Sequence, residues 1–244
     1  MLLELINNNY TFEDKVIIFF TFLVAMITAM TLHEFAHAFV AHKSGDPTPK
    51  AYGRLTVNPM AHIEPMGFMS FLIFGFGLAK PVAVNPLNFK KFRRDMLLVS
   101  IAGVIVNITL AFIFMPFVML FLTYGHGITS MVIYKILAYF LTFMVTINIL
   151  LFVFNLFPVY PLDGFNAMAS YLRHDNKFVV FMKRYGTLVL LGILVLFDLI
   201  YSACDIDILN MICYYVSWPF TQFWSWVFGY GNMNLLGFFL YGVL

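Results

Sequence analysis

The chain of 244 residues is 62% hydrophobic and only 11% charged, with a mean hydropathy of +0.88. These values are far from the averages of soluble proteins, so they exclude an ordinary soluble domain. The small net charge of +2 is spread unevenly, and its distribution is more informative than its size. We expect an all-α polytopic membrane protein in contact with the lipid bilayer, with no nucleic-acid partner.

The first apolar run covers residues 16–42 and is longer than the roughly 20 residues that cross about 30 Å of hydrocarbon. Thr11 precedes the acidic pair Glu13 and Asp14, a pattern typical of a capped helix start with acids in the first turn. The run is too long for the apolar part of a signal peptide and shows no small-residue cleavage pattern. We therefore expect it to be retained as a membrane helix.

The sequence His33-Glu34-Phe35-Ala36-His37 lies near the end of this run. Ionisable side chains inside a membrane helix are costly, so they call for a functional explanation. Residues four apart share one face of a helix, so His33 and His37 can present two imidazoles to one metal ion, with Glu34 alongside to act on its bound water. The pattern predicts a zinc protease site; the alternative is a buried polar cluster used only in packing.

The stretch after the first helix has the composition of a loop over residues 43–64. A short apolar segment, residues 66–79, follows and is interrupted by Gly67, Gly75 and Gly77. It is too short for a comfortable span, so we expect a re-entrant element or a β-hairpin that turns near Gly75. A polar stretch with two prolines and a basic cluster, Lys90, Lys91, Arg93 and Arg94, then covers residues 80–95.

Three more spanning helices are predicted, over residues 96–122, 132–157 and 185–204. Residues 208–228 could cross the membrane, but three tryptophans and Pro219 equally fit an interfacial segment. We thus expect four transmembrane helices, the re-entrant or β-hairpin segment, and one or two further C-terminal membrane helices. Residues 1–244 would form one membrane-embedded domain, with a core of about 12–204 and a C-terminal membrane segment, 205–244.

Lysine and arginine predict the orientation of these helices. Of the 14 such residues, 12 fall in two regions, 43–94 and 173–184. Cytoplasmic loops carry an excess of these residues, so both regions should face the cytoplasm. The N-terminus would then lie outside, and the His33 motif, roughly 25 Å along the first helix at 1.5 Å per residue, would lie near the cytoplasmic face of a cell membrane.

A catalytic zinc ion usually has three protein ligands and one open position, so a third ligand is needed. Glu64 is conceivable, but Asp163 fits better because the third helix has by then returned to the cytoplasmic side. Pro158 and Pro161 permit an irregular turn back into the protein just before it. The alternative for Asp163 is a cap at a helix start. His42 and His62 lack the helical spacing of the motif and are expected at the interface or beside the ligands.

The H-E-F-A-H motif together with Asn155-Leu-Phe-Pro158-Val-Tyr-Pro161-Leu-Asp163-Gly164 resembles the site-2 protease family of intramembrane zinc metalloproteases. Two further stretches, which begin at Gly53 and at Lys80, resemble its compact prokaryotic members without a PDZ domain. The resemblance covers roughly residues 30–175. One departure is Ala102-Gly103-Val104-x-x-Asn107, where the family pattern has proline after the glycine.

This resemblance implies that His33, His37 and Asp163 bind one Zn²⁺ per chain, that Glu34 is the general base and acid, and that Asn155 contacts the substrate backbone or the developing oxyanion. It also implies that the glycine-broken segment is a membrane-dipping β-hairpin. The expected function is cleavage of peptide bonds within or near transmembrane segments of other membrane proteins, in a bacterial or archaeal cell membrane.

Two alternatives from other classes are open. The histidines could form the transit site of a metal-ion transporter, which would need further ligands along a pathway through the membrane. The chain could also be a catalytically inactive scaffold of the same fold, although the intact Glu34 argues against that.

Overall fold

The computed structural model describes residues 10–64, 67, 80–173, 175–204 and 206–230. Four of the helices in these residues are long and apolar enough to cross a membrane, as predicted: α2 (Phe12–Lys43), α5 (Phe92–Tyr124), α6 (Met131–Leu156) and α8 (Lys177–Cys204). The chain is therefore a multi-pass membrane protein. The predicted hairpin segment and the last C-terminal residues lie outside the described residues.

Shorter elements connect these helices: α3 (Thr48–Ala51), η1 (Pro59–Ala61), η2 (Pro86–Asn88), η3 (Gly125–Gly127) and α7 (Asp163–Ala169). A last described helix, α9 (Ile208–Phe228), follows α8. It has 21 residues, but it is not among the four helices that meet the length and composition of a span. Its position across or along the membrane remains a prediction.

The starts of two helices test the predicted boundaries. Thr11 caps α2 as expected, since its Oγ1 accepts a hydrogen bond from the Asp14 N–H at 3.2 Å. By contrast, α8 begins at Lys177 rather than at residue 185, so the prediction of a basic loop up to Arg184 was wrong. Lysine and arginine are good helix formers, and the Asn176 side chain accepts from the Phe178 N–H at 2.9 Å at the helix start.

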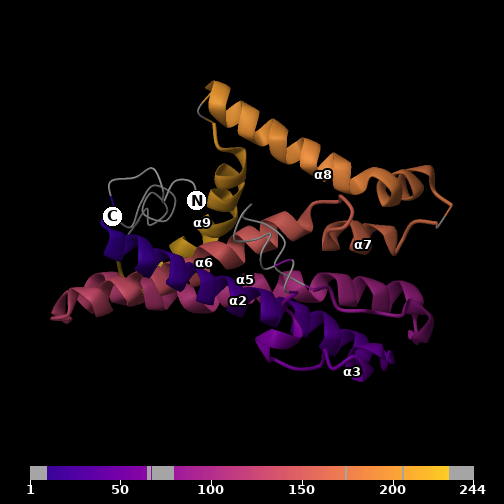
Figure 1. The fold of residues 1–244 in the computed structure, drawn as a ribbon, viewed down its shortest axis with the longest axis horizontal. Coiled ribbons are helices and arrows are strands. Elements are labelled where there is room, and N and C mark those ends of the chain that lie inside the picture. The colour runs from indigo at the N-terminus through magenta and orange to yellow at the C-terminus, as the bar shows by residue number, and fades with distance from the viewer. Residues whose placement is uncertain (1–9, 65–66, 68–79, 174, 205, 231–244) are drawn as a thin grey trace.

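Helices α2, α5 and α6 lie side by side and form the core, whereas α8 stands away from them (Figure 1). Two fully buried alanines of α2, Ala25 and Ala29, pack against Met144, Ile147 and Leu151 of α6. Small residues let helix backbones approach closely, which is how helices associate in lipid. Only Val179 and Gly186 of α8 are buried.

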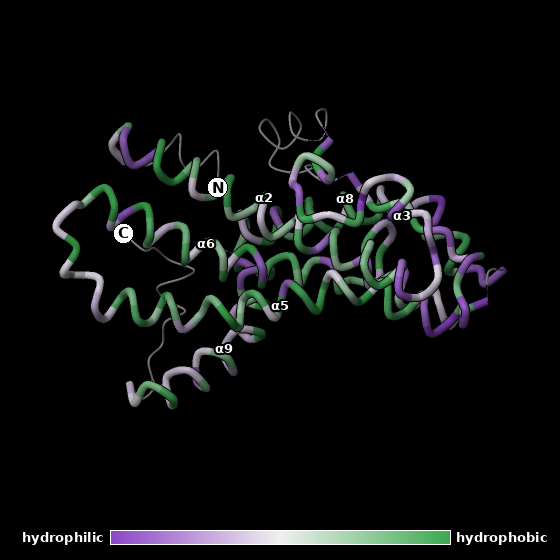
Figure 2. Tube along the Cα trace, turned by 90° about the horizontal axis from the view of Figure 1, so that it is seen from below, coloured by the Kyte–Doolittle hydropathy of each residue, from purple (hydrophilic) through white to green (hydrophobic). Residues whose placement is uncertain are grey.

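Most hydrophilic residues gather at the end of the molecule that holds α3 (Figure 2). This end contains the loop after α2 and the start of α5, which together carry one of the two basic regions. At the opposite end, the Lys135 Nζ donates to the Asp14 Oδ1 at 2.5 Å and joins α6 to α2. The two ends of the bundle thus differ in charge. The predicted orientation depends on this difference, because the end with more lysine and arginine is expected to face the cytoplasm.

Asp46 ties the loop after α2 to the loop before α5. The side chain is fully buried, and its carboxylate accepts from the Thr48 N–H at 3.1 Å and from the Thr48 hydroxyl at 2.6 Å. From the second loop it accepts from the Asn85 N–H at 2.7 Å and from the Asn88 Nδ2 at 2.8 Å. Four donors converge on one carboxylate, so this contact closes the polar end of the bundle.

Helix α5 approaches α2 closely at Gly103. A Cβ atom placed on Gly103 would lie 2.5 Å from the Cε1 of His33 and 2.6 Å from the Nε2 of His37. Real Cβ atoms do not come this close to other heavy atoms. The two imidazoles of the motif therefore occupy space that only a glycine on the neighbouring helix leaves free.

The Asp46 contact predicts a pH-dependent contribution to stability. Burial alone would raise the pKa of Asp46, but hydrogen bonds from Thr48, Asn88 and Asn85 outweigh it and hold the pKa below its ordinary value of 3.8. Because the pKa is lowered by folding, the contribution is present above about pH 4 and is lost as the pH falls through the folded-state pKa. Asp46→Asn should destabilise by about 2 kcal/mol at pH 7, since hydrogen bonds to charged groups are the stronger ones.

The measurement is the free energy of unfolding in detergent at pH 7 and at pH 3. The difference between wild type and Asp46→Asn should shrink at the lower pH. Asp175→Asn is the control, because that carboxylate is exposed and pairs with the exposed Arg173. An equal loss at both pH values for Asp46→Asn would contradict this account.

The packing at Gly103 predicts an effect of one added methyl group. Gly103→Ala should lower the free energy of unfolding by about 1–3 kcal/mol, because the new Cβ must displace buried side chains. Gly192→Ala in α8 is a matched control: nothing lies within 4 Å of its Cβ position, so it should stabilise by about 0.5–1 kcal/mol through helix propensity. Equal effects of the two substitutions would show that the approach at Gly103 is not tight.

Candidate metal centre

Helix α2 places His33, Glu34 and His37 at the buried face toward α5, with exposed fractions of 4%, 8% and 8%. The first turn of α7 brings Asp163 to the same point. The Asp163 Oδ2 lies 3.2 Å from the His33 Nε2 and 3.1 Å from the His37 Nε2, and the two Nε2 atoms are 3.1 Å apart. Among the described residues, these three form the group whose ligand atoms could hold one metal ion.

The structure also bears on the two candidates for the third ligand, Asp163 and Glu64. Asp163 begins α7, but the cap position belongs to Leu162 and carries no side-chain hydrogen bond. The Asp163 Oδ2 is buried and has no hydrogen-bond partner, so the side chain is not a helix cap. Glu64 is exposed and lies outside the ligand group.

An irregular turn between α6 and α7 positions Asp163, as the two prolines predicted. The turn is held by the Val159 N–H bonded to the Phe157 carbonyl at 2.8 Å and the Leu162 N–H bonded to the Val159 carbonyl at 2.9 Å. Gly164 then packs directly on the end of α6: its Cβ would lie 2.7 Å from the Phe157 carbonyl oxygen and closer still to that of Leu156. This backbone contact fixes the start of α7 against α6.

The hydrogen bonds at the other ring nitrogens determine what the three ligand atoms are. The His37 Nδ1 lies 2.7 Å from the Val99 carbonyl oxygen, which can only accept, so Nδ1 carries the proton. The His33 Nδ1 lies 2.5 Å from the Asn107 Oδ1, which imposes the same tautomer. In the neutral rings both Nε2 lone pairs therefore face the Asp163 carboxylate oxygen, an arrangement that a shared metal ion would stabilise.

The spacing of these atoms agrees with zinc. Zinc binds imidazole nitrogen at about 2.0–2.1 Å and carboxylate oxygen at about 2.0–2.2 Å, so tetrahedral ligands lie roughly 3.3–3.5 Å apart. The observed separations of 3.1–3.2 Å are within a few tenths of an ångström of this value. The donor set, two neutral imidazoles and one carboxylate, also suits this ion.

Glu34 follows His33 on α2, and its Oε2 accepts from the Val82 N–H at 3.0 Å. Val82 belongs to the extended segment that runs from Lys80 to η2. The same segment is anchored by the Lys80 N–H bonded to the His62 carbonyl at 2.8 Å. One backbone donor thus fixes the Glu34 carboxylate and holds this segment of chain beside the candidate centre.

The remaining predicted residues lie elsewhere. Asn155 is half-buried in the last turn of α6, and its Nδ2 donates to the Leu151 carbonyl at 3.1 Å within its own helix. Its contact with a substrate therefore remains a prediction. His62 is buried with its Nε2 2.8 Å from the Thr56 carbonyl oxygen, and neither it nor His42 belongs to the ligand group.

The structure adds three residues that the sequence analysis assigned no role: Gly103 and Asn107 on α5, and Asn148 on α6. Gly103 and Asn107 are four positions apart and share the face of α5 that meets α2. For Asn107 and Asn148 a signal was available: an amide side chain is costly to bury in an apolar spanning helix, so each asparagine there is expected to have a polar partner. That signal does not say which partner the amide contacts.

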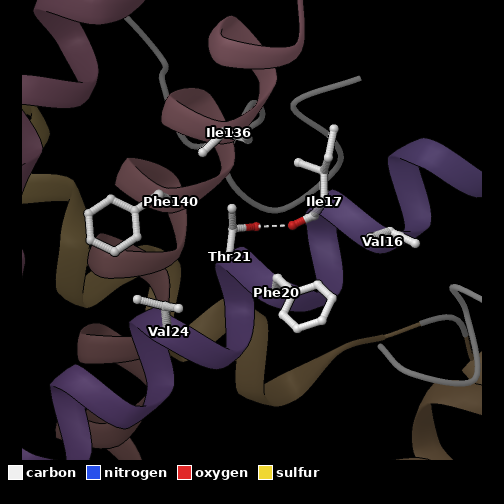
Figure 3. Close-up of a pocket in the computed structure, with 7 residues that line it drawn as sticks. All are labelled: Val16, Ile17, Phe20, Thr21, Val24, Ile136 and Phe140. Atoms are coloured by element: carbon white, nitrogen blue, oxygen red, sulfur yellow. Dashed lines mark hydrogen bonds between the residues drawn. The ribbon is translucent and has the colours of Figure 1, made fainter.

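An apolar groove of about 360 Å³ lies between α2 and α6, away from this centre (Figure 3). It is lined by Val16, Ile17, Phe20, Thr21, Val24, Ile136 and Phe140. The Thr21 hydroxyl donates to the Ile17 carbonyl at 2.7 Å, so the groove offers no free polar group. Val24 precedes His33 by roughly 13 Å along the helix, and the groove takes no part in the site.

The chain is similar to three proteins whose names describe the same activity. Over 146 residues it is 44% identical to the "Putative zinc metalloprotease YwhC" of Bacillus subtilis (strain 168), covering 59% of this chain and 66% of the relative. It is 26% identical over 220 residues to the "Putative zinc metalloprotease Rip2" of Mycolicibacterium smegmatis, covering 85% and 82%. The protein of that name from Mycobacterium tuberculosis H37Rv is 29% identical over 186 residues, covering 73% and 68%.

The match thus spans just under two thirds of the Bacillus relative. No family model and no solved structure matches the chain. The two Rip2 proteins match 85% and 73% of this chain. The names of these relatives, each a zinc metalloprotease, support the resemblance of the chain to the site-2 protease family.

Proposed function

We propose that this protein is a zinc endopeptidase that cleaves peptide bonds within or near the transmembrane segments of other membrane proteins. The observation that carries the proposal is the convergence of three acceptor atoms, from His33, His37 and Asp163, beside the Glu34 carboxylate. The names of the relatives, each a zinc metalloprotease, support the same activity.

In this proposal His33, His37 and Asp163 hold one Zn²⁺ per chain. A zinc ion bound there would lower the pKa of a coordinated water and polarise the scissile carbonyl. Glu34 acts as the general base that takes the water proton and then as the acid that delivers it to the leaving nitrogen. The Val82 N–H, 3.0 Å from the Glu34 Oε2, keeps this carboxylate oriented.

The substrate class follows from the surroundings of the site. A helical substrate has its carbonyls engaged in hydrogen bonds to residues four positions on, so it must unwind locally before attack. The extended segment next to Glu34, together with the glycine-broken segment before it, would hold the unwound chain by strand addition. Asn155 would contact the substrate backbone or the oxyanion after turning away from the Leu151 carbonyl.

The proposal also places the protein in the cell. The distribution of lysine and arginine supports an orientation with the N-terminus outside and the centre near the cytoplasmic face. The bacterial relatives support a bacterial or archaeal cell membrane. Water reaches a centre at that depth more easily than one at the midplane. Residues 1–244 would act as a single membrane-embedded protease domain.

The Glu34→Gln variant tests this function. A glutamine can still accept from the Val82 N–H, so the fold and the zinc content should change little. Cleavage should fall by about 10²–10⁴-fold, the typical contribution of a general base. The measurement compares zinc content and cleavage of a pool of transmembrane peptides by wild type and variant, both reconstituted in liposomes.

Glu64→Gln is the matched control, because Glu64 is exposed and lies outside the ligand group. It should cleave as the wild type does. If Glu34→Gln cleaves at the wild-type rate, the proposed role of Glu34 is wrong. If the wild type cleaves no peptide but carries zinc across the liposome membrane, the transporter alternative replaces the protease.

A further inference from the structure

A row of buried polar groups runs behind the candidate centre and crosses three helices. The His33 Nδ1 meets the Asn107 Oδ1 at 2.5 Å, and the Asn107 Nδ2 donates to the Asn148 Oδ1 at 3.0 Å. The Asn148 Nδ2 then donates to the Met144 carbonyl oxygen at 2.7 Å. Asn107 and Asn148 are both fully buried, so solvent does not compete for these bonds.

The row has a direction because it ends on a backbone carbonyl. The Met144 oxygen can only accept, so the Asn148 amide must turn its Nδ2 toward Met144 and its Oδ1 toward Asn107. Asn107 must in turn present its Nδ2 to Asn148, which leaves its Oδ1 facing His33. The proton of His33 is therefore held at Nδ1, and the Nε2 lone pair is free to bind a metal ion.

The reverse orientation would be costly. A flipped Asn148 amide would place its Oδ1 against the Met144 oxygen and leave two buried acceptors facing each other. Burying a polar group without a partner costs a few kcal/mol. The second ligand does not need such a relay, because the Val99 carbonyl contacts the His37 Nδ1 directly at 2.7 Å.

We propose that Asn148 is a positioning residue of the metal centre, which acts through Asn107 to hold His33 in the tautomer that binds the ion. Neither amide is assigned a role by the family motifs quoted above, and Asn148 lies on α6, which carries none of the three ligands. The inference rests on the proposed zinc site. A merely structural role, in which the two amides only join α5 to α6, would give stability without affecting the metal.

The test uses the full-length protein in detergent, with zinc affinity measured by competition against a chelator. Asn148→Leu removes the hydrogen bonds that Asn148 makes to Asn107 and to the Met144 carbonyl. The Asn107 amide can then flip, donate to the His33 Nδ1 and stabilise the tautomer of His33 that carries its proton at Nε2. Zinc affinity should fall about 10- to 100-fold, the usual effect of changing a residue that supports a metal ligand. The absorption spectrum of the cobalt-substituted protein should change as well.

A conservative variant and a double mutant make the test sharper. Asn148→Asp, protonated in this apolar site, can donate to Met144 and accept from Asn107, so it should retain wild-type zinc affinity. Asn107→Leu should weaken zinc binding, and adding Asn148→Leu to it should cause no further loss. Non-additivity of this kind is the signature of one residue that acts through another.

Trp224→Phe controls for the loss of an interhelical hydrogen bond, since the Trp224 Nε1 donates to the Phe112 carbonyl at 3.1 Å and joins α9 to α5. It should lower stability and leave zinc affinity and the cobalt spectrum unchanged. If the asparagine variants behave like this control, the positioning role is wrong although the zinc site stands. If the wild type binds no zinc, the proposed function fails, and this inference fails with it.

Discussion

Three electron-pair acceptors facing one another inside an apolar bundle are the constraint on which the rest of this structure depends. The Nε2 atoms of His33 and His37 and the Oδ2 of Asp163 lie 3.1–3.2 Å apart. Such groups repel, and burying them without compensation would cost several kcal/mol. A bound cation turns this repulsion into attraction, so the site and the fold around it are stable together.

Several helices together position the side chains of this site. The four-residue spacing on α2 puts two imidazoles on one face, and Gly103 lets α5 approach closely enough to cover them. The irregular turn after α6 and the backbone contact at Gly164 bring the carboxylate of Asp163 to the same point. Protein carbonyls and amides then determine the protonation of the ring nitrogens, in keeping with the support that metal-binding histidines usually have.

Much of this arrangement was predictable from the sequence, for physical reasons. Long apolar runs predict spanning helices because the bilayer sets their length, and the Thr11 cap and the prolines before Asp163 are local signals. The three candidate ligands could be named because intramembrane ionisable residues are few. The start of α8 was predicted too late in the sequence. Hydropathy alone does not show whether the basic residues before an apolar helix lie in a loop or in the first turns of that helix.

The supporting residues could not be predicted in the same way. Which carbonyl or amide meets a ring nitrogen depends on how α2, α5 and α6 pack, and that packing is a tertiary property. Asn148 lies 41 positions from its partner Asn107 in the sequence, and nothing local relates the two. The close approach at Gly103 is similar, since a glycine in a spanning helix does not reveal which side chains occupy the space beside it.

The central claim is that His33, His37 and Asp163 bind zinc, and zinc K-edge X-ray absorption of the purified protein tests it most directly. The account predicts one zinc ion per chain, four-coordinate, with imidazole nitrogen and carboxylate oxygen ligands at about 2.0–2.2 Å. It also predicts that Asp163→Ala changes the oxygen contribution and preserves the imidazole signal. Zinc without imidazole scattering, or a spectrum that Asp163→Ala leaves unchanged, would contradict the account.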